Sequence, residues 1–226
     1  MTTLFIARRD IHRARQTQAQ LEASRELQML GVARSCFRAR AALAQLDPDV
    51  LLIDLRLEDG AALPLVRELR DAHQRRGERP RVMVVAADAA DPLLFTTMVA
   101  GADAYLLESD LATAEAAIQR MVRGEAAMAA PIAAQVLRFF REPVEAPKGA
   151  PVPNDRALDW QTHGANPMQL SPGERRMLQL LAAGARSAEV AQRMALSMEA
   201  VGRRIGNVYR KLSWDVRSGA LALLAA

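Results

Sequence analysis

Short apolar runs alternate with longer amphipathic segments through the first 140 residues of this 226-residue chain. The runs are Leu4–Ala7, Val50–Ile53, Val82–Val85 and Tyr105–Leu107. Segments with helical spacing follow them at about 11–30, 61–74, 92–99 and 111–122, and a weaker strand near 29–33 precedes a helix at about 37–46. A strand that is apolar on both sides must be covered on both, as in a parallel sheet between two layers of helices. The pattern predicts a doubly wound α/β domain.

Proline and glycine interrupt any periodic pattern over residues 141–169, and five prolines lie in this stretch. This composition is typical of a linker. Trp160 is an aromatic residue in a polar segment, so we expect part of the linker to pack on a neighbouring domain. The predicted organisation is an α/β domain at 1–140, a Pro-rich linker at 141–169 and a second domain at 170–226.

The second domain has helical patterns only. Ser171-Pro172-Gly173-Glu174 has the form of a capping box, in which the serine oxygen and the glutamate carboxylate accept from each other's amides. The helix that starts there runs to about Ala183, with Gly184 after it. Ser187 and Ser197 are predicted caps of a second helix at 188–194 and a third at 198–212. The short connections predict an all-α helix-turn-helix domain.

The net charge of +4 is confined to the last third of the chain. Residues 1–140 contain 18 basic and 18 acidic side chains, whereas residues 141–226 contain 12 basic and 8 acidic. A basic domain beside a neutral one indicates nucleic acid as a partner, and a basic solvated surface is the alternative. Cys36 is the single cysteine, which argues against a disulfide scaffold and most zinc sites. No apolar run is long enough for a membrane span or a signal peptide, so we expect a cytoplasmic protein.

The third helix has an apolar stripe and a basic arc. The stripe consists of Val201, Ile205, Val208 and Leu212, and the basic residues off it are Arg203, Arg204, Arg210 and Lys211, with Arg193 on the preceding helix. An arginine on such a helix can pair with guanine in the major groove or bind phosphate. Arg203 is the first candidate for base contact and Arg204 the second. An ordinary solvated surface helix remains the alternative.

The segment LSPGERRMLQLLAAGARSAEVAQRMALSMEAVGRRIGNVYRKLSW resembles the DNA-binding domain of NarL/LuxR-type response regulators, over about Leu170–Ala226. The resemblance lies in its Leu-Ser-Pro-x-Glu opening, its turn after Gly184, its Leu-Ser-x-x-x-Val segment and its Arg-Lys-Leu ending. It implies four helices, of which the third reads the major groove and the fourth, at about 216–224, supports dimerisation. It also implies that Ser197 is a DNA-binding residue.

The predicted recognition helix departs from the family pattern at three positions. Gly202 stands where the family usually has Lys or Arg, Ala200 stands where it has Thr, and Gly206 occupies another position that often faces DNA. These departures predict altered or weaker base readout and phosphate anchoring. Each helical glycine also costs about 1 kcal/mol of helix stability.

The first domain resembles the flavodoxin-like receiver domain of the same regulators. The segment DVLLIDLRLEDG matches the strand and loop that carry the phosphoacceptor aspartate, here Asp54, and GADAYLLESD matches the fifth strand, with Tyr105 at the aromatic position. The acidic pair that helps bind Mg²⁺ in the family corresponds to Arg8 and Arg9. The hydroxyl residue of the fourth strand corresponds to Ala86, and the fifth-strand lysine corresponds to Glu108.

Four of the five pocket positions have therefore lost the chemistry of the family. Phosphoryl transfer to a carboxylate needs Mg²⁺, which an arginine repels, so we expect no metal, no cofactor and no phosphorylation of Asp54. We hypothesise that Arg8 or Arg9 pairs with Asp54 or Glu108 and holds the domain in one state. Drift after loss of selection is the alternative explanation.

The leading prediction is a homodimeric DNA-binding transcription regulator, not an enzyme, with double-stranded DNA as partner. Its atypical receiver domain would act without phosphorylation, as an oligomerisation module or as the site of a protein partner. Two alternatives stay open at this point. One is a conventional phosphorylation-activated two-component response regulator. The other is an interaction factor that has lost DNA binding and heterodimerises with another regulator.

Overall fold

The computed structural model describes residues 1–76, 80–140 and 169–224, and the side chains of 73–76 and 213–224 are not part of the description. The chain divides into two compact units, Met1–Ala127 and Met128–Ala226, named here the α/β unit and the helical unit. The predicted linker and Trp160 lie outside the described residues. Within the described part of the chain, no helix combines the length and apolarity that a bilayer crossing requires.

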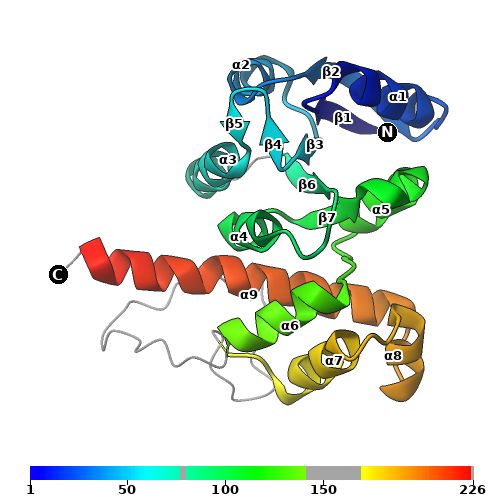
Figure 1. The fold of residues 1–226 in the computed structure, drawn as a ribbon, viewed down its shortest axis with the longest axis vertical. Helices are drawn as coiled ribbons and strands as arrows, with labels where there is room; N and C mark the ends of the chain where they lie inside the picture. The colour runs from blue at the N-terminus through cyan, green and yellow to red at the C-terminus, as the bar shows by residue number, and fades with distance from the viewer. Residues whose placement is uncertain (77–79, 141–168, 225–226) are drawn as a thin grey trace. The chain divides into compact units, whose positions relative to one another are not determined.

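The α/β unit is built on a five-stranded parallel sheet, as predicted. The strand order is β2-β1-β3-β6-β7, with β1 (Thr2–Ala7), β2 (Leu27–Ala33), β3 (Val50–Asp54), β6 (Arg81–Ala86) and β7 (Ala104–Leu107). Helices α1 (Ile11–Glu22) and α5 (Ala114–Val122) lie on one side of the sheet. Helices α2 (Cys36–Leu46), α3 (Leu63–Arg76) and α4 (Pro92–Ala100) lie on the other (Figure 1).

The strands are buried on both sides because their side chains alternate between the two helix layers. Leu4, Ile6 and Leu52 are fully buried and share a core with Ile118 of α5. The intervening Leu51 is fully buried as well. The continuous apolar runs in the sequence therefore predicted these strands correctly.

Two connections at the carboxyl ends of the strands carry extra structure. A hairpin of β4 (Arg56–Leu57) and β5 (Gly60–Ala61) follows β3, and the 3-10 helix η1 (Glu108–Thr113) follows β7. The hairpin begins two residues after Asp54, the last residue of β3, and η1 begins with Glu108, directly after β7.

The predicted helix at 11–30 is too long. Helix α1 ends at Glu22, and residues from Leu27 form β2, which pairs with β1 along its whole length. The backbone amide of Thr2 also donates to the Glu26 carbonyl at 2.9 Å. Pairing between β1 and β2 therefore begins at residues whose sequence pattern still favours a helix.

The helical unit contains α6 (Ala130–Phe139), α7 (Pro172–Ala182), α8 (Ser187–Arg193) and α9 (Met198–Leu224). Helix α6 was not predicted, and it belongs to the helical unit rather than to the first domain, whose predicted limit was residue 140. The physical reason is its apolar face, in which Ile132 and Val136 are fully buried while the helix packs against α7.

The capping predictions for α7 and α9 are confirmed. The Ser171 hydroxyl accepts from the Glu174 amide at 3.2 Å, and the Ser171 amide donates to the Glu174 carboxylate at 2.7 Å. Gly184 follows α7 with a positive φ of 90°. At the start of α9, the Ser197 hydroxyl accepts from the Ala200 amide at 3.1 Å.

Two other predictions for the helical unit are wrong. Helix α8 starts at Ser187 with Arg186 as its N-cap residue, because the Glu189 carboxylate already accepts from the Arg186 amide at 3.1 Å. The separate fourth helix at 216–224 is absent, since α9 continues unbroken to Leu224. Residues 212–218 contain neither Gly nor Pro, so nothing in the backbone interrupts the helix there.

Candidate functional site

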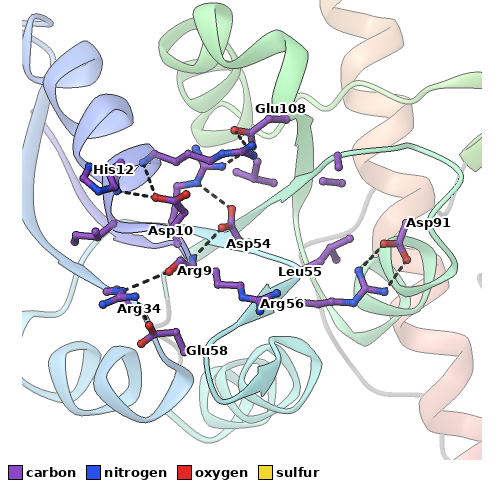
Figure 2. Close-up of a pocket in the computed structure, with 16 residues that line it drawn as sticks. Arg9, Asp10, His12, Arg34, Asp54, Leu55, Arg56, Glu58, Asp91 and Glu108 are labelled. Carbon is purple, nitrogen blue, oxygen red and sulfur yellow. Dashed lines mark hydrogen bonds and ion pairs between the residues drawn. The ribbon is translucent and has the colours of Figure 1, made fainter.

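The carboxyl ends of the parallel strands bring charged residues together at one edge of the sheet. Asp54 is the last residue of β3, Arg8 follows β1, and Glu108 follows β7. Figure 2 shows the Asp54 and Glu108 side chains directed into the same space, although they are 54 residues apart in sequence.

Arg8 joins the two carboxylates. Its Nε donates to Asp54 Oδ1 at 3.0 Å, its Nη2 pairs with Glu108 Oε2, and its Nη1 donates to the Thr17 hydroxyl of α1 at 2.8 Å. Only 2% of the Arg8 surface is exposed. The predicted pairing is therefore present, and one arginine makes it with both acidic groups.

Arg9 contributes through its backbone. Its amide donates to Asp54 Oδ2 at 3.0 Å, while its side chain is exposed. A second cation reaches the other side of Glu108, where Arg13 Nη1 lies 3.4 Å from Oε1. Both oxygens of Asp54 and both oxygens of Glu108 are thus engaged by the protein itself.

Further pairs tie the rim of this pocket together (Figure 2). Arg34 pairs with Glu58, its Nε donates to the Arg9 carbonyl at 3.4 Å, and Arg56 pairs with Asp91 at 2.7 Å. The pocket has a volume of about 920 Å³. The predicted pocket residues that line it are Arg8, Arg9, Asp54, Ala86 and Glu108. Tyr105 is instead a buried residue of β7 outside this lining.

Burial raises the pKa of the Asp54 carboxyl above its ordinary value of 3.8. The Arg8 guanidinium and the Arg9 amide act in the opposite direction, and the nearby Glu108 carboxylate adds to the increase. Withdrawal from water therefore outweighs the pairing with Arg8.

The pocket does not fit the Mg²⁺ ion that a receiver fold implies. Mg²⁺ takes oxygen ligands in octahedral geometry, and here both Asp54 oxygens already accept from Arg8 and Arg9. The fully buried guanidinium of Arg8 adds a fixed positive charge. Across the described residues, no group of three or more His, Cys, Asp or Glu side chains is placed to hold a metal ion.

The second candidate site is the outer surface of α8 and α9. The stripe of Val201, Ile205, Val208 and Leu212 is fully buried, as predicted. Arg193, Ser197, Arg203 and Arg210 are exposed. Arg203 pairs loosely with Glu199, 3.6 Å away on the preceding turn, and Arg210 contacts Asn207. These arginines are accessible to a polyanion.

Two residues of the predicted DNA-binding set lie elsewhere. Lys211 Nζ is 2.6 Å from the Glu174 carboxylate and donates to the Gln169 carbonyl at 3.1 Å. The Glu174 side chain is only 8% exposed, so this ion pair is mostly buried. The Arg204 guanidinium lies against Gly173 at the start of α7.

The sequence did not reveal Thr17 and Arg13 as members of the pocket. Thr17 lies on the buried stripe of α1, between Ala14 and Leu21. A hydroxyl at an otherwise apolar position of such a stripe was the available signal, because a buried polar group needs a hydrogen-bond partner. Arg13 lies one turn earlier on the exposed side and carried no signal.

Residues 168–223 match the family model described as GerE, bacterial regulatory proteins of the luxR family. The part of the helical unit that contains α7, α8 and α9 therefore matches the luxR-type helix-turn-helix family, and α6 lies outside the match. Over most of the chain, the transcriptional regulatory protein LiaR of Bacillus subtilis is 28% identical over 205 residues, which cover 88% of this chain and 85% of LiaR.

Solved structures share the fold of both units. The RcsB response regulator of Salmonella typhimurium aligns with 93% of this chain and 91% of its own, with a TM-score of 0.50 and 15% identity. The two-component response regulator RcsB in complex with DNA aligns with 96% of this chain and 98% of its own, with a TM-score of 0.51 and 15% identity. These similarities concern the fold.

Proposed function

We propose that this chain is a DNA-binding transcription regulator of the response-regulator type, and that it binds double-stranded DNA in the cytoplasm as a homodimer. The observation that carries DNA binding is the exposed basic surface of Arg193, Arg203 and Arg210 on a luxR-type domain. LiaR is named a transcriptional regulatory protein, and RcsB has been solved with DNA, which supports the same role here. No catalysed reaction is part of the proposal.

We further propose that the α/β unit works without phosphorylation of Asp54. The buried Arg8 guanidinium supports this, because it pairs with both Asp54 and Glu108, and together with the Arg9 amide it leaves no oxygen of Asp54 free for a cation. The unit then serves as a fixed interaction module for a second copy or a protein partner. A conventional phosphorylated regulator would need Arg8 displaced and Mg²⁺ bound beside its positive charge.

A salt titration tests DNA binding. Each phosphate contact contributes about 0.9 to the slope of log affinity against log salt concentration, so phosphate contacts by Arg193 and Arg210 of both subunits predict a steep slope. The measurement is a gel shift with duplexes selected from a random pool by the full chain. Arg203→Ala is expected to weaken binding to the selected duplex about 10-fold or more, as loss of a bidentate base contact does.

One observation favours a second function, that of an interaction factor that does not bind DNA. Gly202 is buried and Gly206 has no side chain, so neither of these positions of α9 offers DNA a contact near Arg203. If the selection recovers no duplex at low salt while the chain forms a complex with another regulator, this second function replaces the first.

A further inference from the structure

Gly173 is the second residue of α7 and has an ordinary helical backbone, without a positive φ. Its conformation therefore does not require glycine. A glycine in a helix costs about 1 kcal/mol relative to alanine. What a side chain at this position would meet is therefore decided by its surroundings.

The surroundings of Gly173 are the guanidinium of Arg204. A β-carbon at position 173 would lie 2.9 Å from Arg204 Nη1 and 3.7 Å from its Cζ. The half-buried Arg204 side chain thus occupies the space that any other residue at 173 would fill. Because this atom is the end of a flexible side chain, a β-carbon would displace the guanidinium from this space.

Arg203 and Arg204 face different neighbours. Successive residues of a helix are 100° apart, so the two side chains cannot occupy the same side of α9. Arg203 is 56% exposed on the outer arc. Arg204 lies on the side of Lys211, seven residues later, whose ammonium binds Glu174 and the Gln169 carbonyl. This side of α9 faces the beginning of α7.

We infer that Arg204 is a positioning residue for DNA recognition. Its guanidinium fills the space left by Gly173 and, together with the buried stripe of α9 and the Lys211–Glu174 pair, holds the start of α9 against α7, which keeps Arg203 at the exposed surface. The inference rests on the proposed DNA binding. It assigns base readout in the first two turns of α9 to Arg203, since Gly202 is buried and Gly206 has no side chain to contribute.

The test uses the full chain and two probes of equal length, a duplex that the unmodified chain selects from a random pool and a random-sequence duplex. The variants are Gly173→Ala, Arg204→Ala, Arg204→Lys and the double variant Gly173→Ala with Arg204→Ala. Arg203→Ala is the matched control on the neighbouring arginine. Thermal unfolding of each variant verifies that the helical unit is folded.

A positioning role predicts that Gly173→Ala and Arg204→Ala each weaken binding to the selected duplex about 5-fold, and that the double variant is no weaker than Arg204→Ala. The slope of log affinity against log salt stays the same in all of them, while the preference for the selected duplex falls. Arg204→Lys behaves like Arg204→Ala, because an ammonium lacks the planar group that fills the space.

A phosphate contact by Arg204 would give different results. Gly173→Ala would then leave affinity unchanged, Arg204→Ala would lower the salt slope by about 0.9, and Arg204→Lys would retain most of the binding. Those results overturn the positioning role and leave the proposed function intact. If the unmodified chain selects no duplex at all, the DNA-binding function itself is wrong and the inference falls with it.

Discussion

Arg8 is the residue on which the α/β unit depends most. Its guanidinium is withdrawn from water and bonded to two carboxylates and a hydroxyl that come from three different elements. A buried arginine cannot lose its proton, so the two acids must stay close enough to compensate its charge. The residues that oppose Mg²⁺ binding are therefore the same ones that hold β1, β3 and β7 together at the pocket.

Removal of Arg8 is expected to destabilise the α/β unit strongly. Arg8→Met leaves Asp54 and Glu108 partly buried without a cation, and we expect the free energy of unfolding to fall by about 3 kcal/mol. Hydrogen exchange of the β1 and β3 amides measures this unit separately from the rest of the chain. Arg9→Met is the matched control, because the Arg9 side chain is exposed, and its effect should stay within about 0.5 kcal/mol. Equal effects of the two variants would contradict this account of Arg8.

The Asp54 carboxyl should titrate above its ordinary pKa of 3.8. Burial is the main cause, and Arg8→Met should raise the pKa further because it removes a group that lowers it. The raised pKa means that the folded protein holds this proton more tightly than the unfolded chain. The contribution of this group to stability is thus present below 3.8 and lost as the pH rises through the folded pKa. NMR titration of the carboxyl carbon measures it, and a pKa below 3.8 would show that pairing outweighs burial.

At the scale of elements, α7 and α9 are joined by a polar contact as well as by their apolar faces. Glu174 completes the capping box of α7 and also accepts from Lys211 of α9. One buried carboxylate therefore satisfies the start of one helix and neutralises a cation of another. The predicted role of Lys211 in DNA binding competes with this contact.

Lys211→Met is expected to lower the free energy of unfolding of the helical unit by about 2 kcal/mol, because it leaves the mostly buried Glu174 without its cation. Addition of Glu174→Gln should recover part of the loss, with a coupling energy above about 1 kcal/mol in the double-mutant cycle. Thermal unfolding of the four proteins gives this value. Simple additivity would show that the ion pair contributes nothing.

The sequence predicted elements well where burial alone decides them. The apolar runs located β1, β3, β6 and β7 to within two residues, because strands covered on both faces cannot tolerate polar side chains. Helix α6 was missed because its apolar face is recognisable only against α7. The excess length of the predicted helix after β1 has a similar cause, since pairing with β1 overrides the local preference of residues after 26.

The sequence predicted that the candidate pocket contains an ion pair, but it did not predict which arginine makes it. Exchange of charge signs between positions 8, 9 and 108 indicated an internal ion pair. Whether Arg8 or Arg9 makes it depends on which side chain turns inward where β1 ends, and strand periodicity no longer decides this beyond the last ladder residue. In α9, the apolar stripe was predictable, whereas the different surroundings of Arg203 and Arg204 depend on α7.

At the scale of the whole molecule, an α/β unit with almost no net charge and a basic helical domain divide two tasks. We propose that the helical domain binds DNA and that the α/β unit binds a partner. In this proposal, phosphorylation of the α/β unit does not control DNA binding. A ligand can shift a conformational equilibrium only through a difference in affinity between the two states. Under this proposal, Arg8 in the pocket leaves Mg²⁺ and phosphoryl groups no such state to select.

The most direct test is the DNA affinity of the full chain with and without fluoroberyllate and Mg²⁺, which together mimic an aspartyl phosphate. The account predicts that the DNA affinity of the unmodified chain is the same within about twofold under both conditions. It predicts that the DNA affinity of Asp54→Asn is also the same within about twofold with and without fluoroberyllate and Mg²⁺. A tightening of about 10-fold or more by fluoroberyllate that disappears in Asp54→Asn would contradict it, and would show that this chain is switched by phosphorylation in spite of Arg8.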